Sequence, residues 1–381
     1  MKKLIRVFVV SMTFVFLSSL NGFTADKGNF STAPKTNNGK KWRIGFYEGG
    51  DYIDYQSTLT ATVNGMITLG WIEKIEIPKQ ESAHTSALWK WLSANVKSNY
   101  LEFPADAHYS ANWDDELRKK MAEDIINRLN NKKDIDLMIA SGTWAGQDLA
   151  NNKHQTPVIV VSTSDPLKAG IIKSIEDSGN DYIHARVDPL RYKRQVELFH
   201  EVAKFKTLGI AYENTEAGRS YGAVDMVENT AQERGFEVVS CYTQSDIPDK
   251  TIAQESVKKC FEEFAAKKVD AIYVTAQRGI NSDNISELAN IANKNKIPTF
   301  SQPGSKFVEN GLLMSVAKAG FQANGIFHAQ TIAKVFNGAK PRQLEQVLEN
   351  PQKIAINEKT AEILQFKIPI EFVEIIDEVY N

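Results

Sequence analysis

Small polar and charged residues follow five apolar runs of this sequence, and hydrogen bonding to a polar ligand is the chemistry that they offer. Each group is short and precedes a helix-like segment. For any one of them alone a helix N-cap is the favoured interpretation, because Ser, Thr, Asp and Asn are preferred there. Five such groups together favour a shared binding cleft. They are Tyr47–Asp51, Ser141–Trp144, Ser162–Pro166, Glu213–Glu216 and Ala276–Gly279.

The residue types in these groups indicate a small zwitterion. Carboxylates can pair with an ammonium, a guanidinium or free backbone N–H groups can hold a carboxylate, and aromatic rings can pack against a side chain. An amino acid or similar molecule fits this set best, while a cationic amine or another small organic molecule stays open. The candidate ligand-binding residues are Tyr47, Glu48, Asp51, Thr143, Trp144, Ser164, Asp165, Asn214, Glu216 and Arg278.

Catalytic and metal-binding patterns are not found in the sequence. Trp144 stands where a Gly-X-Ser-X-Gly nucleophile elbow needs its serine, and no phosphate-binding Gly-X-X-X-X-Gly-Lys-Ser/Thr loop occurs. The six histidines are scattered, without a pair at metal-ligand spacing. The net charge of −2 argues against a general nucleic-acid binder. We therefore expect no enzyme, no cofactor, no metal and no nucleic acid.

The segments that must position these residues alternate between strand-like and helix-like patterns. Continuous Val, Ile and Leu runs such as Val158–Ser162 are typical of strands buried on both faces of a parallel sheet, and another strand is expected at Ile72–Ile77. Helical patterns separate the strands, as in βαβ units. With 381 residues, the chain is long enough for two domains. The predicted fold class is α/β, with two doubly wound parallel-sheet lobes.

The N-terminus predicts export. Lys2, Lys3 and Arg6 precede an apolar run of 14 residues, Val7–Leu20, which is too short to span a membrane. We expect residues 1–25 to be a signal peptide and residues 26–41 a flexible leader. No cysteine lies near the end of the apolar run, so no lipid anchor is expected. The two cysteines, Cys241 and Cys260, form a disulfide or remain two buried thiols, and the sequence leaves both open.

Several segments, in their order, resemble the ABC-transporter substrate-binding family that includes tryptophan- and tyrosine-type periplasmic binding proteins. The most specific pieces are Gly142-Thr143, the Ser164-Asp165-Pro166 turn with Gly170, and Asn357 with Ala361. The sequence departs from the family pattern at Asn180–His184 and at Gln277-Arg278, so the resemblance leaves the ligand's identity open. The segments that carry the resemblance are SGTWAGQDLA, TPVIVVSTSDPLKAGII, LGIAYENTEAGRSY, VDAIYVTA, KIPTFSQPGSKFVENGLLMSVAKAGFQANG and KIAINEKTAEILQFKIP.

The resemblance implies a type I periplasmic binding fold, whose two lobes are joined by hinge strands and close on a ligand between them. It implies hinges near Arg186–Asp188, Ser315–Lys318 and Arg342–Lys353. Residues 42–186 and 316–342 would form the first lobe, and residues 187–315 and 343–381 the second.

The resemblance also implies a role. The protein would be a periplasmic, monomeric solute-binding protein of an ABC importer. It would capture its ligand and deliver it to an inner-membrane permease with an ATPase. The alternative is the ligand-binding component of a sensory or chemoreceptor system.

Overall fold

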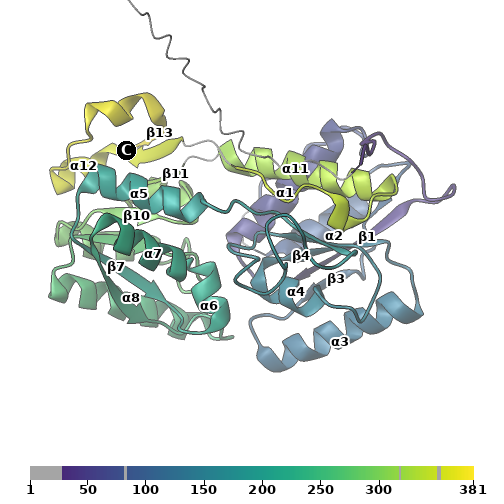
Figure 1. Ribbon diagram of the computed structural model, residues 1–381, viewed down its shortest axis with the longest axis horizontal. Helices are drawn as coiled ribbons and strands as arrows, with labels where there is room; N and C mark the ends of the chain where they lie inside the picture. Colours follow the sequence, from purple (N-terminus) through teal and green to yellow (C-terminus); the bar gives the residue numbers. More distant parts are fainter. Residues whose placement is uncertain (1–27, 81–83, 317–318, 350–352) are drawn as a thin grey trace, which may run out of the picture.

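The computed structural model describes residues 28–80, 84–316, 319–349 and 353–381. The predicted signal peptide, residues 1–25, lies outside this part of the chain. The described residues form two α/β lobes that lie side by side, with the C-terminal elements on one lobe and α1 and α11 on the other (Figure 1). Among these residues no helix is long and apolar enough to cross a membrane.

Lobe 1 is built on a parallel sheet in the order β2-β1-β4-β5-β6, with β3 also paired to β1. Its strands read as buried apolar runs, and β4 and β5 are buried along their whole length, as expected for a sheet covered on both faces. Its strands are β1 (Trp42–Glu48), β2 (Leu101–Glu102), β3 (His108–Ser110), β4 (Leu137–Ser141), β5 (Val158–Val161) and β6 (Ile183–Ala185), and its helices are α1 (Ile53–Thr68), α2 (Thr85–Asn95), α3 (Asp115–Asn131), α4 (Gly142–Leu149), α11 (Ala319–Phe336) and the 3-10 helix η1 (Pro341–Gln343).

Lobe 2 is built on a seven-stranded sheet in the order β13-β12-β11-β10-β9-β7-β8. All its pairs are parallel except β11 with β12, because the chain has visited lobe 1 between these strands and returns in the opposite direction. Its strands are β7 (Thr207–Tyr212), β8 (Glu237–Tyr242), β9 (Ala271–Val274), β10 (Thr299–Ser301), β11 (Met314–Val316), β12 (Ile354–Asn357) and β13 (Ile376–Tyr380), and its helices are α5 (Arg191–Ala203), α6 (Glu216–Tyr221), α7 (Val224–Arg234), α8 (Lys250–Lys267), α9 (Ile285–Lys294), α10 (Lys306–Glu309), α12 (Glu358–Leu364) and the 3-10 helix η2 (Ile370–Ile375).

The two sheets confirm the predicted class of two doubly wound α/β lobes. The expected strand at Ile72–Ile77 is wrong, because this segment has no strand in the structure. Ile72 instead packs in the lobe 1 core.

Helix α11 belongs to lobe 1 although it follows a strand of lobe 2 in the sequence. It packs on α1 so closely that a Cβ atom on Gly325 would lie 2.4 Å from the carbonyl oxygen of Ala61. A Cβ atom on Gly65 would lie 2.7 Å from the carbonyl oxygen of Gly325. Two glycines thus allow the helix backbones to touch, and this contact returns the chain to lobe 1.

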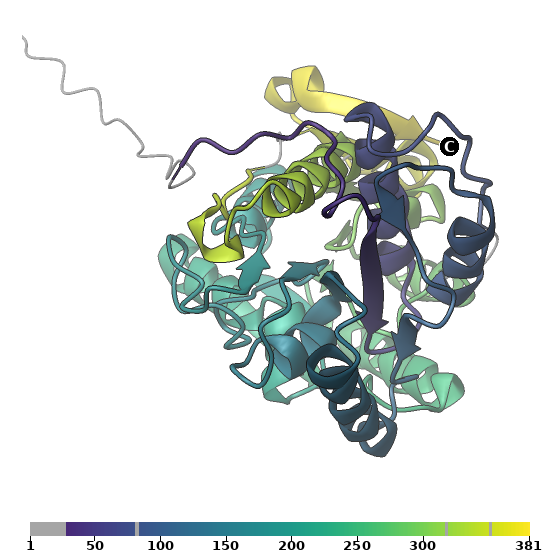
Figure 2. The same cartoon turned by 90° about the vertical axis from the view of Figure 1, so that its right-hand side faces the viewer.

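Residues 28–41 differ from the flexible leader expected for this segment. The indole N–H groups of Trp71 and Trp42 donate to the carbonyl oxygens of Thr32 and Lys35, at 2.8 and 2.7 Å. Asn337, just after α11, donates to the carbonyl oxygen of Ala33 at 3.0 Å. The segment therefore lies along lobe 1 and runs beside α11 (Figure 2).

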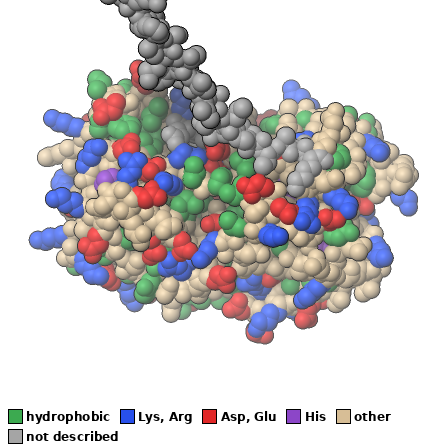
Figure 3. Space-filling view, viewed as in Figure 1, with side chains coloured by type: hydrophobic (Ala, Val, Ile, Leu, Met, Phe, Trp, Pro, Cys, Tyr) green, Lys and Arg blue, Asp and Glu red, His purple; other side chains and the backbone are tan. Residues whose placement is uncertain are grey.

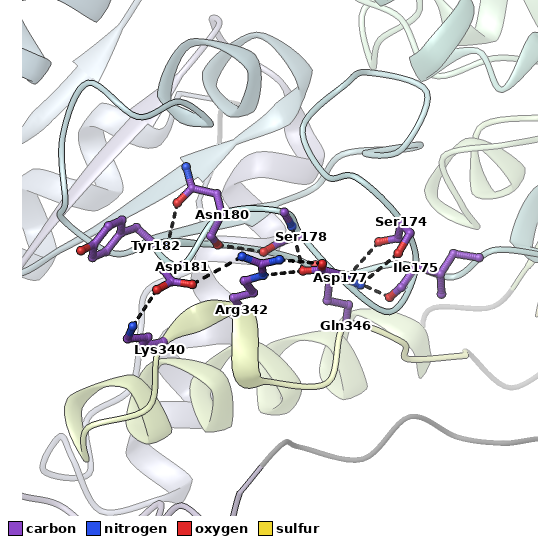
Figure 4. Close-up of polar contacts among 11 residues, drawn as sticks. Ser174, Ile175, Asp177, Ser178, Asn180, Asp181, Tyr182, Lys340, Arg342 and Gln346 are labelled. Atoms are coloured by element: carbon purple, nitrogen blue, oxygen red, sulfur yellow. Dashed lines mark hydrogen bonds and ion pairs between the residues drawn. The ribbon is translucent and has the colours of Figure 1, made fainter.

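Two of the segments that cross between the lobes, one at Val187 and one at Gln346–Leu348, are joined by backbone hydrogen bonds. Val187 N–H donates to the carbonyl oxygen of Gln346 at 2.7 Å, and Leu348 N–H donates to that of Val187 at 3.0 Å. Arg342 then binds Asp177 through two hydrogen bonds of 2.6 and 2.8 Å, with Lys340 on Asp181 beside it (Figure 4). These contacts hold the lobe 1 end of the later crossing in place. The expected hinge positions near 186–188 and 342–353 remain predictions about motion.

Large exposed hydrophobic residues are concentrated on the C-terminal elements of lobe 2, where hydrophobic side chains gather in the space-filling view (Figure 3). Ile370 is 85% exposed, and Ile363, Val373 and Val379 are also exposed.

Candidate functional site

A cleft of about 130 Å³ lies between the two lobes, and residues of both lobes line it. Lobe 1 contributes the first turns of α1 and α4 and the segment after β5. Lobe 2 contributes the first turn of α5 and the segments after β8, β9 and β10. Most of these segments follow the carboxyl ends of parallel strands, which is where ligands bind in open α/β sheets.

The N-terminus of α4 lies at the cleft and has the chemistry to hold an anion. No side chain caps the helix, so its first N–H groups are available to a ligand. Gly142 begins the helix at φ +88°, and a Cβ atom there would lie 2.0 Å from the hydroxyl of Tyr55. Only glycine combines this left-handed conformation with the close approach of Tyr55. Thr143 and Trp144 follow it and line the cleft.

Asp246, on the segment after β8, faces α4 across the cleft. The carboxylate of Glu213 accepts hydrogen bonds from the N–H groups of Ser245 and Asp246, at 2.8 and 2.7 Å, and so holds this segment. The indole N–H of Trp144 donates to Asp246 Oδ2 at 3.2 Å, from the opposite lobe. Burial, with the charge of Glu213 in addition, raises the pKa of Asp246 to about 7. A cationic group placed here would lower that pKa again.

Aromatic rings surround this end of the cleft. Trp113 meets Trp144 edge to face with ring centroids 5.5 Å apart, and Tyr55 lies 6.4 Å from Trp113. Tyr221 of lobe 2 lines the opposite side. Rings in this arrangement offer flat apolar surfaces against which another ring can pack.

The other end of the cleft lies at the hinge and is rich in arginine. Asp188 pairs with Arg194 at 2.6 Å and with Arg186 at 3.5 Å. Burial lowers the pKa of Arg186 to about 10, and the charge of Arg191 lowers it further. Asp54, at the start of α1, faces Arg191, and burial raises the pKa of this carboxyl to about 7.

Four of the ten candidate residues line the cleft, namely Thr143, Trp144, Ser164 and Arg278. Asp51 lies beside them, with its Oδ1 3.7 Å from Arg278 Nη2 across the lobes.

The remaining candidates lie elsewhere. Tyr47 is buried in the sheet and donates to Asp148 Oδ2 at 2.7 Å. Glu48 is only 3% exposed and accepts a hydrogen bond of 2.6 Å from Thr85. Asn214 and Glu216 are exposed to solvent and do not line the cleft.

The carboxylate of Asp165 bonds to the backbone of the turn that follows it. Its Oδ1 accepts a hydrogen bond of 2.9 Å from the N–H of Lys168, which caps the turn after Pro166. Its carbonyl oxygen accepts a hydrogen bond of 3.0 Å from Ser220 of lobe 2. The carboxylate therefore stabilises the turn and does not line the cleft.

Sequence reasoning missed several lining residues, among them Trp113, Arg191, Tyr221 and Asp246. Asp246 follows strand β8, so its signal was a polar residue just after an expected strand, the same signal that identified Thr143 and Ser164. Trp113 lies in a segment after β3 that breaks the βαβ pattern. Arg191 and Tyr221 belong to helices, and the helical pattern does not show which end faces the other lobe.

The buried carboxyl groups predict that stability falls as the pH rises from 6.5 to 8.5. The pKa values of Asp54 and Asp246 are raised to about 7 and that of Glu48 to about 8. Between pH 4 and 8 these three carboxyls hold more protons in the folded chain than in the unfolded chain, so their contribution to stability falls as the pH rises. Burial lowers the pKa of His108 to about 4 and that of His328 well below its usual value. These histidines act in the opposite direction below pH 6.5, where the unfolded chain takes up protons that the folded chain does not, and so they reduce the gain in stability at lower pH.

Urea denaturation of the ligand-free protein at pH 5.5, 6.5, 7.5 and 8.5 checks this expectation. The free energy of unfolding should be higher at pH 6.5 than at 8.5. A stability that rises steadily from pH 6.5 to 8.5 would contradict it.

Comparison with known proteins gives relatives for both sequence and fold. A family model described as ABC transporter substrate binding protein matches residues 110–379. A tyrosine-binding protein of Clostridioides difficile (strain R20291) is 27% identical over 238 residues, which cover 61% of this chain and 64% of that protein. The match therefore spans less than two thirds of that relative's length.

Solved structures share the two-lobed type I fold. A conserved domain protein from Vibrio cholerae matches with a TM-score of 0.67 at 18% identity, covering 89% of this chain and 100% of that one. The ABC domain in complex with L-Trp from Streptococcus pneumoniae matches with a TM-score of 0.66 at 21% identity, with the same coverage. A ligand-free, open substrate-binding protein with adhesive properties from Clostridium difficile matches at 0.59 and 21% identity, covering 89% of this chain and 99% of that one.

Proposed function

The chain belongs to the ABC transporter substrate-binding proteins, and we propose that it binds a free amino acid with an aromatic side chain in the cleft between its lobes. The observation that carries this proposal is the contact between Trp144 and Asp246. It brings an uncapped helix N-terminus and a partly buried carboxylate together on the two sides of one cleft.

Each end of a zwitterion has a partner at this position. The N–H groups at the start of α4 would hold the α-carboxylate, since a helix N-terminus attracts an anion. Asp246 would accept the hydrogen bonds of the α-ammonium. The side chain would then pack between Tyr55, Trp113 and the hinge end. The names of two relatives, a tyrosine-binding protein and a domain in complex with L-Trp, support an aromatic side chain.

The physiological role that we propose is uptake. The protein would be exported as a monomer and would deliver its ligand to an ABC permease and its ATPase without changing it chemically. A strain that lacks the protein should take up the labelled amino acid more slowly, and a plasmid copy should restore uptake. Unchanged uptake with a lost behavioural response to the ligand would favour the sensory alternative.

Ligand binding is tested by melting the purified protein with each of the twenty amino acids at 1 mM. An amino acid that binds the folded state raises the melting temperature by mass action, and chromatography should recover it unchanged. We expect the aromatic amino acids to give the largest shifts. If none of the twenty shifts the melting temperature, the proposed ligand class is wrong.

Closure of the lobes should accompany binding. In the structure Lys168 of lobe 1 pairs with Asp225 of lobe 2 at 2.7 Å, and the Trp144–Asp246 bond also joins the lobes. Without ligand these few contacts compete with solvation of the open cleft, so we expect open forms to be populated. Small-angle scattering should give a smaller radius of gyration at saturating ligand than without it. An unchanged radius would contradict closure.

A further inference from the structure

The hinge end of the cleft gathers buried polar atoms that have no hydrogen-bond partner. They are Tyr52 Oη, Arg186 Nε, Gln195 Nε2, Asn324 Oδ1 and His328 Nδ1, all from residues that line the cleft. Gln195 and His328 are each only 2% exposed. A buried polar group without a partner is destabilising, so a set of them in one cavity wall indicates a ligand that supplies the missing partners.

Arg191 adds a cation to this set. Its guanidinium has no ion-pair or hydrogen-bond partner among the residues that the structure describes, and lies over the ring of Tyr192 at 5.1 Å. Arg186 and Arg194, by contrast, both pair with Asp188. Asp54 faces Arg191 from lobe 1 without forming an ion pair with it. Arg191 is therefore the guanidinium that a ligand can engage at this end.

The hinge end is separate from the position where we place the α-amino and α-carboxyl groups. Asp246 is bonded to Trp144 and Glu213, whereas the ion pairs of Asp188 with Arg186 and Arg194 form the hinge end. Tyr55 lies between the two ends, with its ring 5.4 Å from that of Tyr52 at the hinge end and 6.4 Å from that of Trp113 at the other end. An aromatic side chain beginning near Asp246 would thus point its far end toward Arg191.

We propose that the hinge end recognises a hydrogen-bond acceptor at the far end of the ligand's side chain, which makes a phenol the preferred ring. This inference rests on the proposed function. Arg191, Arg186 Nε and Gln195 Nε2 are donors and require an acceptor. A phenol oxygen accepts from them, and its own proton can go to Asn324 Oδ1 or to Tyr52 Oη. An unsubstituted benzene ring has no polar group there, and an indole has a donor but no acceptor.

The test compares L-Tyr, L-Phe and L-Trp by calorimetry at pH 7.5, with the wild type and Arg191→Met. The wild type should bind L-Tyr at least roughly tenfold more tightly than L-Phe, because L-Phe leaves the buried polar groups unpaired. L-Trp should also bind more weakly than L-Tyr. Arg191→Met should weaken L-Tyr by at least roughly tenfold and leave L-Phe within about twofold, so that the preference is lost.

Two further variants keep the result interpretable. Arg234→Met removes an arginine of lobe 2 that pairs with Glu197 and Glu201 on the surface, and it should change none of the affinities. Tyr52→Phe removes one hydroxyl with little change in packing, and it should weaken L-Tyr selectively even if Arg191→Met fails to fold.

The outcomes separate the two proposals. Equal wild-type affinities for L-Tyr and L-Phe, or equal losses for both ligands in Arg191→Met and in Tyr52→Phe, overturn this inference but leave the proposed function intact. If no aromatic amino acid binds the wild type, the proposed function is wrong and this inference is wrong with it.

Discussion

Asp246→Asn should weaken binding of the amino acid by about 30-fold or more, while the protein still folds. Removal of one partner from a desolvated, charged hydrogen bond costs roughly 2–5 kcal/mol, and each 1.4 kcal/mol is a factor of ten in affinity. Asparagine keeps an oxygen that can accept the hydrogen bond from the Trp144 indole, so the cleft should keep its shape. Calorimetry gives the affinity, and the melting temperature shows whether folding is retained.

Asp165→Asn is the matched control for this experiment. Asp165 undergoes the same chemical change, but its carboxylate caps a turn outside the cleft, and asparagine caps about as well as aspartate. We expect affinity and melting temperature close to those of the wild type. If Asp246→Asn binds as the wild type does, or if Asp165→Asn is the weaker binder, Asp246 does not hold the ammonium.

The pH dependence of affinity gives an independent check on Asp246. With a pKa of about 7 in the free protein, the carboxyl is increasingly protonated below pH 7. Binding of an ammonium then requires release of that proton, so affinity should fall by up to about tenfold per unit as the pH drops below 7. This pH dependence should be weaker in Asp246→Asn. An affinity that stays constant from pH 7.5 to 5.5 would contradict the assignment.

Loss of the disulfide between Cys241 and Cys260 should lower the stability of lobe 2 by about 3 kcal/mol, the chain-entropy estimate for a loop of this length. The bridge joins positions 19 residues apart, with Cα atoms 5.6 Å apart. It ties β8, an edge strand that pairs only with β7, to the core-facing side of α8. The double variant Cys241→Ala/Cys260→Ala should therefore unfold at a lower urea concentration than the wild type.

A reducing agent supplies the control for this prediction. Added to the wild type during unfolding, it should reproduce most of the destabilisation, and it should have no effect on the double variant. Neither cysteine lines the cleft, so ligand affinity should be unchanged. If both cysteines of the unreduced, unfolded wild type react with an alkylating agent, the bridge is absent and the prediction fails.

The positions of the elements were largely predictable because their signals are local. Apolar runs such as Val158–Val161 are strands that a covered parallel sheet buries on both faces. Ile72–Ile77, in which three isoleucines are interspersed with Glu and Lys, was also expected to be a strand but forms none. Helix α1 was not predicted. This helix carries two threonines with buried side chains. The hydroxyl of Thr58 is hydrogen-bonded to that of Ser162, and the hydroxyl of Thr62 donates to the carbonyl oxygen of Thr58. Buried threonines hide the apolar stripe by which an amphipathic helix is recognised.

The candidate site was predictable only as a set of strand ends. The sequence alone determines that polar residues follow buried strands, and parallel pairing brings those ends to one edge of each sheet. Thr143, Trp144 and Ser164 were found in this way. Side-chain direction follows from the backbone of each strand and turn. Tyr47 lies in strand β1 and faces Asp148, and the turn at Pro166 directs the Asp165 carboxylate to Lys168.

Tertiary structure alone decided which groups face each other across the cleft. Trp144 and Asp246 are 102 residues apart, and no local pattern relates them. Their contact depends on how α11 returns to lobe 1 and on the angle at which the hinge strands hold the two lobes. The same holds for Arg191, a helical residue without an ion-pair partner among the residues that the structure describes, while Asp188 pairs with Arg186 and Arg194. Composition and periodicity act over a few residues, whereas the charges and rings of this cleft are set by packing between segments far apart in the chain.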